Sequence, residues 1–291
     1  MNYSPPIQRI QFSEFKNSEV EIFMKRDDLL HPFISGNKWR KLKYILLEAK
    51  AQSKNHLVSF GGPYSNHLLA LACAGATYGF KTTGFVRGER VSNKMLQLCE
   101  IWGMQLSFIS REEFKDKPGI YQKHFGAYES SYFIDEGGKG ELAIKGCEEI
   151  LDEVNGFTHV ICAVGTGTTL AGLTRASYPK QIMAEGICVL KGAEKMDAEI
   201  AAMARLPVKV HHRFHGGGYA KADPTLLPLI KKFASETGIL LDSVYNAKML
   251  SGVLTLVKEG YYSKDNRLLL LHTGGLLGLL SYLNSGDGEE E

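Results

Sequence analysis

Short apolar runs that end in glycine-rich turns and lead into helical patterns recur along this chain. Two segments show this most clearly: "HLVSFGGPYSNHLLALACAGATYG", beginning at residue 56, and "THVICAVGTGTTLAGLTRAS", beginning at residue 158. A buried strand followed by an apolar-periodic helix is the βα unit of parallel sheets that are covered on both faces. This alternation of predicted strands and helices therefore predicts an α/β fold.

The apolar runs that we interpret as strands read EVEIF, HLVSF, TTGFV, SYFI, THVICAV, IMAEGICVL and RLLLLH. With 291 residues, 44% of them hydrophobic, the chain is long enough for two lobes. We expect a larger domain from residues 1–51 and 153–291 and a smaller domain from residues 52–152. The active site is expected between them.

Charge and cysteine content indicate which kinds of ligand or partner this chain is not expected to bind, beginning with nucleic acid and membranes. Lys and Arg number 34 against 32 Asp and Glu, so the net charge of +2 gives no field that would favour nucleic acid or an anionic membrane. No apolar segment reaches the length of about 18 residues that a spanning helix needs. The five cysteines are odd in number and form no C-x-x-C pair, which argues against a zinc ribbon and a disulfide framework. We expect a cytoplasmic protein that acts on a small molecule.

Three strand-to-helix turns have a composition suited to ligand binding: GGPYSNH, GTGTT and HTGG. Ligands of open parallel sheets gather beyond the carboxyl ends of strands, where helix N-termini present N–H groups. In the turn from Gly165 to Thr169, glycines let the backbone close on an anion and threonine hydroxyls can donate to it. The turn lacks the lysine of a P-loop and the spacing of a dinucleotide motif, so taken alone it is equally consistent with a structural role.

Lys38 is the candidate nucleophile. On a helix that starts near Asn37 it lies one turn before Leu42, at the rim of the buried face. Desolvation there and nearby cations would favour the neutral amine that Schiff-base chemistry requires. Lys41, one turn along, could supply positive charge to a phosphate. For either lysine the alternative is a solvated surface position.

The segment Ser65-Asn66-His67 opens another helix. Ser65 could be an ordinary N-cap, or this helix end could hold a substrate carboxylate.

Five motifs carry a resemblance to a known family: KRDDLLHPFISGNKWRKL, GGPYSNH, GTGTTLAGL, DSVYNAK and HTGG. From about Ile22 to Gly275 the chain resembles the family of 1-aminocyclopropane-1-carboxylate deaminases and D-cysteine desulfhydrases. These are pyridoxal-phosphate enzymes of the tryptophan-synthase β-like fold, called fold type II. The resemblance implies two open, twisted, mostly parallel sheets flanked by helices, with pyridoxal 5'-phosphate as cofactor.

Cofactor-binding roles follow from the resemblance. Lys38 would form the Schiff base, Asn66 would hydrogen-bond the phenolic oxygen of the cofactor, and Thr273 would lie near its pyridine nitrogen. The residues that would hold the phosphate, with help from Lys41, are Gly165, Thr166, Gly167, Thr168 and Thr169.

The substrate-binding roles also come from the resemblance. Ser65, Asn66 and His67 would bind the substrate, with its carboxylate facing Ser65 and His67, and Ser65 would also relay protons. Tyr219 and Tyr245 resemble the two active-site tyrosines of the family. Asn246, which we also place in the substrate site, stands where the deaminases carry a glutamate.

The function expected is β-elimination from a small amino acid such as D-cysteine. Lys38 would take the α-proton and a tyrosine would protonate the leaving group, yielding a 2-oxo acid and ammonia. One alternative is opening of the cyclopropane ring of 1-aminocyclopropane-1-carboxylate, against which the missing glutamate counts. Another is a pyridoxal-phosphate-binding protein without turnover. The resemblance further implies a homodimer.

No metal site is expected. His211, His212 and His215 have a suggestive spacing, but no carboxylate or cysteine stands at a helical offset from them. We expect them at a strand end near Tyr219.

Overall fold

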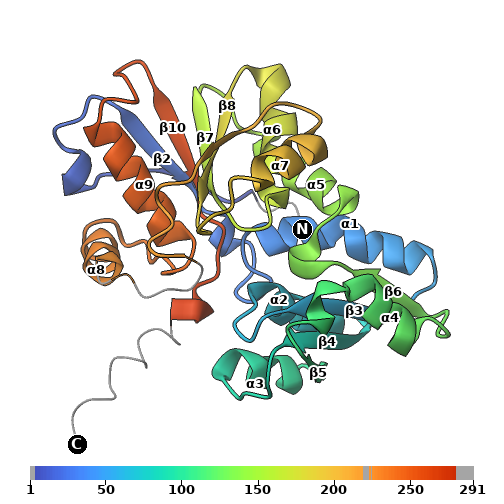
Figure 1. The fold of residues 1–291 in the computed structure, drawn as a ribbon. Helices are drawn as coiled ribbons and strands as arrows, with labels where there is room; N and C mark the ends of the chain where they lie inside the picture. The colour runs from blue at the N-terminus through green and yellow to red at the C-terminus, as the bar shows by residue number, and fades with distance from the viewer. Residues whose placement is uncertain (1–3, 219–222, 224, 280–291) are drawn as a thin grey trace, which may run out of the picture. The chain divides into compact units, whose positions relative to one another are not determined.

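The computed structural model describes residues 4–218, 223 and 225–279. The chain divides into two units, each built on its own sheet (Figure 1). The smaller unit contains residues 31–34 and 38–146, and the larger unit contains the rest. The chain switches units four times: after Leu30, after Ile34, after the first residue of helix α1 (Asn37–Ala51) and inside helix α5 (Glu141–Glu148). The domain boundaries at residues 51 and 153 stay a prediction.

The larger unit contains a six-stranded sheet in the order β1-β2-β10-β7-β8-β9. Its strands are β1 (Ile7–Arg9), β2 (Glu21–Lys25), β7 (His159–Val164), β8 (Met183–Cys188), β9 (Lys209–His211) and β10 (Arg267–Leu271). The short edge strand β1 runs antiparallel to β2, and the remaining pairs are parallel. The carboxyl ends of the parallel strands therefore lie along one edge of this sheet.

Helices cover both faces of this sheet. They are α6 (Thr168–Ser177), α7 (Met196–Ala204), α8 (Leu226–Thr237) and α9 (Asn246–Lys258). Two consecutive residues of β8 show the two faces, since side chains alternate along a strand. A side chain at Gly186 would collide with Leu170 of α6, whereas Ile187 lies against Gly252 of α9.

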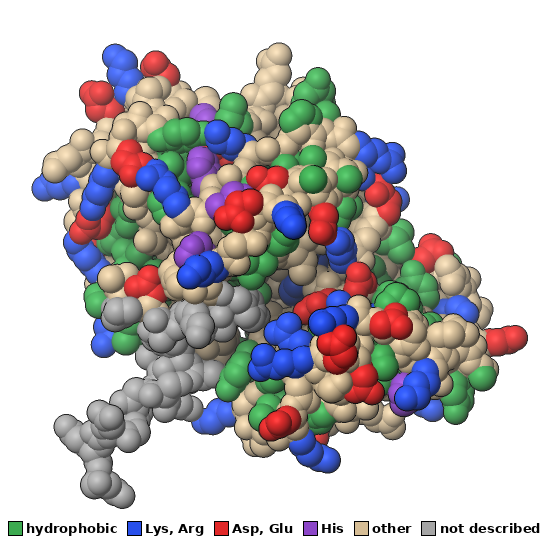
Figure 2. Space-filling view, viewed as in Figure 1, with side chains coloured by type: hydrophobic (Ala, Val, Ile, Leu, Met, Phe, Trp, Pro, Cys, Tyr) green, Lys and Arg blue, Asp and Glu red, His purple; other side chains and the backbone are tan. Residues whose placement is uncertain are grey.

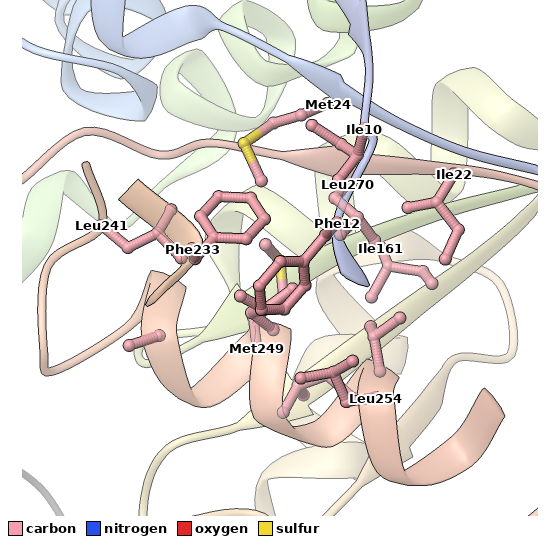
Figure 3. Packing of buried hydrophobic residues seen from close by; sticks show 14 of the residues in the cluster. Ile10, Phe12, Ile22, Met24, Ile161, Phe233, Leu241, Met249, Leu254 and Leu270 are labelled. Carbon is pink, nitrogen blue, oxygen red and sulfur yellow. The ribbon is translucent and has the colours of Figure 1, made fainter. Parts of the chain in front are cut away.

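The core of the larger unit lies between α9, α8 and the sheet (Figure 3). Met24, Ile161 and Leu270 come from three strands. Phe233 of α8 is fully buried, and its ring meets that of Phe12 edge to face with 5.1 Å between centroids. This packing fixes α9 against the strands whose ends carry the candidate site.

The smaller unit contains a four-stranded parallel sheet in the order β5-β4-β3-β6. Its strands are β3 (His56–Gly61), β4 (Lys81–Arg87), β5 (Gln105–Ile109) and β6 (Ser131–Ile134), and its helices include α2 (Asn66–Tyr78), α3 (Lys94–Ile101) and α4 (Lys117–Phe125). Gly84 of β4 faces Leu68 of α2, and the next residue, Phe85, packs on Phe125 of α4. This sheet is also covered on both faces.

The predicted fold class, two mostly parallel sheets flanked by helices, is confirmed. Every apolar run interpreted as a strand overlaps one, while β1, β5 and β9 were not predicted. On the face drawn in Figure 2, acidic and basic side chains are interspersed. Among the described residues no helix has the length and apolar character needed to cross a membrane.

We expect Phe233→Ala to destabilise the protein by about 3–5 kcal/mol, because truncating a buried phenylalanine loses apolar contact and leaves a cavity. Urea unfolding monitored by circular dichroism measures the change. Ile101→Ala is the control, since Ile101 is 75% exposed, and a surface substitution of this kind changes stability by no more than about 0.5 kcal/mol. Equal effects of the two substitutions would contradict the core described above.

Candidate active site

The glycine-threonine turn lies at the carboxyl end of β7 and opens α6. Gly167 precedes the helix with φ of 78°, a left-handed conformation that glycine adopts without strain. Thr168 and Thr169 are buried, and the hydroxyl oxygens of Thr166 and Thr168 lie 3.4 Å apart. Backbone N–H groups of a first helical turn have no acceptor within the helix and attract anions. The geometry suits a phosphate, as predicted from the sequence.

The start of α1 is tied to this turn. Asn37 donates from Nδ2 to the hydroxyl oxygen of Thr169 at 2.9 Å. Gly36, with φ of 59°, packs so closely on the backbone of Thr273 that a Cβ atom would lie 2.0 Å from its carbonyl oxygen. The residue directly before Lys38 is therefore held by the phosphate turn, and the residue before that by the end of β10.

Tyr245 lies beside the same turn. A Cβ atom on Gly165 would lie 3.2 Å from the Tyr245 ring, so the ring lies close to the backbone of the turn. Asn246 is fully buried, and its amide is engaged with Asp242, Thr273 and Gly274. Its role in substrate binding stays a prediction, because the geometry shows the side chain engaged in holding neighbouring residues.

Asp242 is a residue of this region that the sequence did not reveal. Its side chain is 1% exposed and accepts hydrogen bonds from the backbone N–H groups of Tyr245 and Asn246. Burial raises the pKa of Asp242 to about 6, while these hydrogen bonds and the charge of Lys248 act in the opposite direction. Asp242 opens the DSVYNAK motif, but the sequence assigned it no role, because its partners are brought together only by the turn before α9.

In the smaller unit, Lys38 and Lys41 share one acceptor. Each donates from Nζ to the carbonyl oxygen of Gly137 at 3.3 Å. Lys41 is only 2% exposed, so it is a buried cation rather than the solvated surface lysine of the alternative reading. The two amino groups therefore lie close together around one backbone carbonyl.

Ser65 caps α2 by accepting the N–H of Leu68 at 3.2 Å, which is the structural role considered for it. The next residues, Asn66 and His67, stand in the first turn, where no carbonyl of the helix itself can accept from their backbone N–H groups. Binding of a carboxylate at this helix start stays a prediction.

The His67 ring is neutral, with Nε2 as a hydrogen-bond donor and Nδ1 as an acceptor. Its Nε2 lies 2.9 Å from the Ser59 hydroxyl, whose hydrogen is donated to the carbonyl of Ile134, so Nε2 must donate. Nδ1 then carries a lone pair, and it is buried without a hydrogen-bond partner among the described residues. Burial, reinforced by the charges of Lys38 and Lys41, lowers the pKa of His67 well below its usual value. In this state the ring cannot donate to a carboxylate from Nδ1.

The three histidines of the HHRFH segment, His211, His212 and His215, belong to the larger unit, on which Figure 2 shows several histidine side chains. His211 ends β9 and pairs with the buried Glu185, and His212 pairs with Asp197. No group of three or more His, Cys, Asp or Glu suited to a metal ion occurs among the described residues. Tyr219 lies outside the described residues.

We expect acid to destabilise the wild-type protein more than His67→Gln. Below pH 6.5 the unfolded chain binds a proton at His67 that the folded protein excludes, so stability falls as the pH drops through this window. At pH 5 the loss from this site is on the order of 2 kcal/mol. Gln keeps a donor for Ser59 and does not titrate. Urea unfolding of both proteins at pH 7.5 and 5.0 tests this, and identical losses would contradict the neutral assignment.

Comparison with known proteins shows the family to which the chain belongs. A family model described as pyridoxal-phosphate-dependent enzyme matches residues 4–274. A Thermotoga maritima protein, provisionally named a 1-aminocyclopropane-1-carboxylate deaminase, is 32% identical over 285 residues, covering 89% of this chain and 90% of that protein.

An Arabidopsis thaliana protein named a bifunctional D-cysteine desulfhydrase and 1-aminocyclopropane-1-carboxylate deaminase, mitochondrial, is 28% identical, covering 94% of this chain and 77% of that protein. The crystal structure of a homologue of 1-aminocyclopropane-1-carboxylate deaminase, 24% identical, has the same fold with a TM-score of 0.87, covering 97% of this chain and 93% of that one. The chain belongs to the family of pyridoxal-phosphate-dependent enzymes, and its cofactor is pyridoxal phosphate.

Proposed function

We propose that this chain is a pyridoxal-phosphate-dependent lyase that removes the β-substituent of a small D-amino acid, with D-cysteine as the model substrate. The overall reaction converts D-cysteine and water into pyruvate, hydrogen sulfide and ammonia. The family membership and the naming of the Arabidopsis relative support this proposal.

The residues present fit the cofactor. The turn from Gly165 to Thr169 would hold its phosphate, with Lys41 as a nearby cation, and Lys38 would bind its aldehyde carbon. Asn66 and Thr273 would contact the ring. The buried, unpartnered Nδ1 of His67 is consistent with a ligand-binding environment beside the two lysines. When bound, pyridoxal phosphate supplies an electron sink for the carbanion that forms at the α-carbon.

One observation carries the proposal furthest. The hydrogen bond from Asn37 to Thr169 ties the phosphate turn to the residue that directly precedes Lys38. Consecutive Cα atoms are about 3.8 Å apart, so the backbone of Lys38 cannot lie far from that turn. This class of enzyme requires a phosphate cradle and a lysine, and here the lysine directly follows a residue that is hydrogen-bonded to the cradle.

The chain's own groups account for proton transfer. Lys38 would accept the α-proton of the substrate, since its Nζ lies beside the Lys41 cation at the Gly137 carbonyl. Tyr245, whose ring lies against Gly165, would protonate the leaving thiolate or steady the charge at the α-carbon. Ser65 would orient the substrate carboxylate at the start of α2. Tyr219 keeps the role that the resemblance implies.

Ring opening of 1-aminocyclopropane-1-carboxylate is the competing activity. That substrate has no α-hydrogen, so removal of an α-proton by Lys38 cannot start the reaction. The deaminases place a glutamate where this chain has Asn246, a neutral amide whose hydrogen-bonding groups already have partners. The geometry therefore favours β-elimination.

We further propose that the enzyme works in the cytoplasm as a homodimer. The five cysteines are all buried, which suits a reducing compartment. The dimer rests on the resemblance to related enzymes.

We expect the purified protein to be yellow and to carry pyridoxal phosphate on Lys38. Borohydride reduction followed by peptide mapping should place the label on Lys38, because its helix begins beside the phosphate turn. Lys38→Ala should abolish the label, whereas Lys43→Ala, with the same change on the same helix, should retain it. Label on Lys41 would refute the assignment.

Release of 2-oxo acid should be fastest with D-cysteine among D-cysteine, L-cysteine, D-serine and 1-aminocyclopropane-1-carboxylate. Loss of an acid–base group costs about 10²–10⁴-fold in rate, so kcat/KM for ring opening should be at least about 100-fold lower. The measurement is 2-oxo acid formation coupled to a dehydrogenase, with Lys38→Ala as the blank. Comparable turnover of the cyclopropane substrate would overturn the choice of reaction.

A further inference from the structure

The carboxylate of Asp242 gathers three N–H groups in the larger unit. Its Oδ1 accepts from the backbone N–H of Asn246 at 2.8 Å and from Asn246 Nδ2 at 3.1 Å. The backbone N–H of Tyr245 lies 3.0 Å from Oδ2. Because an ionised carboxylate can only accept hydrogen bonds, it fixes which end of the Asn246 amide faces it.

The Asn246 amide in this orientation forms hydrogen bonds with the Thr273–Gly274 turn after β10. Nδ2 donates its second hydrogen to the carbonyl of Gly274 at 2.9 Å, and Oδ1 accepts from the backbone N–H of Thr273 at 3.0 Å. The Thr273 hydroxyl also donates to this oxygen at 3.2 Å. Reversing the amide would break each of these bonds, so the anion at Asp242 determines how the Thr273–Gly274 turn is held.

That turn in turn holds the start of α1. The carbonyl oxygen of Thr273 accepts from the backbone N–H of Asn37 at 3.4 Å, and its backbone lies against Gly36 without room for a Cβ atom. A shift of the turn would therefore displace Gly36 or Asn37, the residues that precede Lys38.

We propose that Asp242 is a positioning residue that acts through Asn246. It fixes the position of the Thr273–Gly274 turn and thereby the positions of Thr273 and of the residues that precede Lys38. The proposal rests on the proposed function for its readout, since Thr273 and Lys38 are assigned to pyridoxal phosphate there. It assigns to Asn246 a supporting role in place of direct contact with substrate.

A purely local role is the competing explanation. Asp242 could serve only to hold the turn before α9 through the backbone N–H groups of Tyr245 and Asn246. The two explanations differ in whether the effect of Asp242 depends on the Asn246 side chain. A double-mutant cycle separates them, because residues that act through one another are non-additive.

The first variant is Asp242→Ser, whose hydroxyl can still accept from backbone N–H groups but is too short to keep the carboxylate's contact with Nδ2. The second is Asn246→Leu, which removes the side-chain amide that joins Asp242 to the Thr273–Gly274 turn. The Asp242 carboxylate then keeps only its hydrogen bonds from backbone N–H groups. Asp116→Ser is the matched control, since Asp116 accepts the N–H of Gly119 at the start of α4 and has no part in the site.

The affinity of each apoprotein for pyridoxal phosphate is measured by fluorescence titration. Asp242→Ser should weaken binding about tenfold in the wild-type background, the loss expected for one hydrogen bond to a charged group. It should weaken binding less than about twofold in the Asn246→Leu background. The same factor in both backgrounds, or an unchanged affinity in the wild-type background, would overturn the proposal.

A second measurement is independent of cofactor binding and also covers a variant that is partly unfolded. Hydrogen exchange of the Thr273 amide in the folded apoprotein should accelerate in Asp242→Ser and in Asn246→Leu to the same degree, and remain unchanged in Asp116→Ser. Unchanged exchange in Asp242→Ser would refute the positioning role. A wild-type protein that binds no pyridoxal phosphate would refute the proposed function, and the exchange data would still decide the role of Asp242.

Discussion

The close approach of Gly36 to the Thr273 backbone is the constraint on which the candidate site depends. It brings the end of β10 to the start of α1, two segments more than 200 residues apart in sequence, with no side chain between them. Asn37 then reaches Thr169 and joins the phosphate turn to the same place. The end of β10, the start of α1 and the phosphate turn are thus held together by contacts within the protein. A side chain at position 36 would have to separate them.

Much of the fold could be predicted from the sequence because buried parallel strands are continuous apolar runs. The strands that were missed, β1, β5 and β9, are short or alternate polar and apolar residues, and each lies at the edge of its sheet. The phosphate turn and Lys38 could be proposed from the sequence because each is a local pattern. The contacts of Asp242 and Asn37 could not be predicted, because partners such as Asn246 and Thr169 are brought close only by folding.

Several buried charged groups in this protein form hydrogen bonds with the backbone. Lys248 donates to the carbonyls of His215 and Gly218, and Lys41 donates to that of Gly137. Asp242 accepts from two backbone N–H groups. An isolated buried charge is costly, but peptide dipoles held in place by a rigid fold can stabilise it. The charges consequently fix the loops that supply those dipoles, which are the loops around the candidate site.

The fixed tautomer of His67 has a consequence for inhibitor design. A ligand group that reaches Nδ1 meets a lone pair in a dry environment, where a mismatched pair of acceptors is costly. Hydroxylamines, hydrazines and amides would present a hydrogen to it, whereas a second carboxylate or a ketone oxygen would be repelled. Selectivity could thus be obtained from a nitrogen atom that forms no hydrogen bond with the residues that the structure describes.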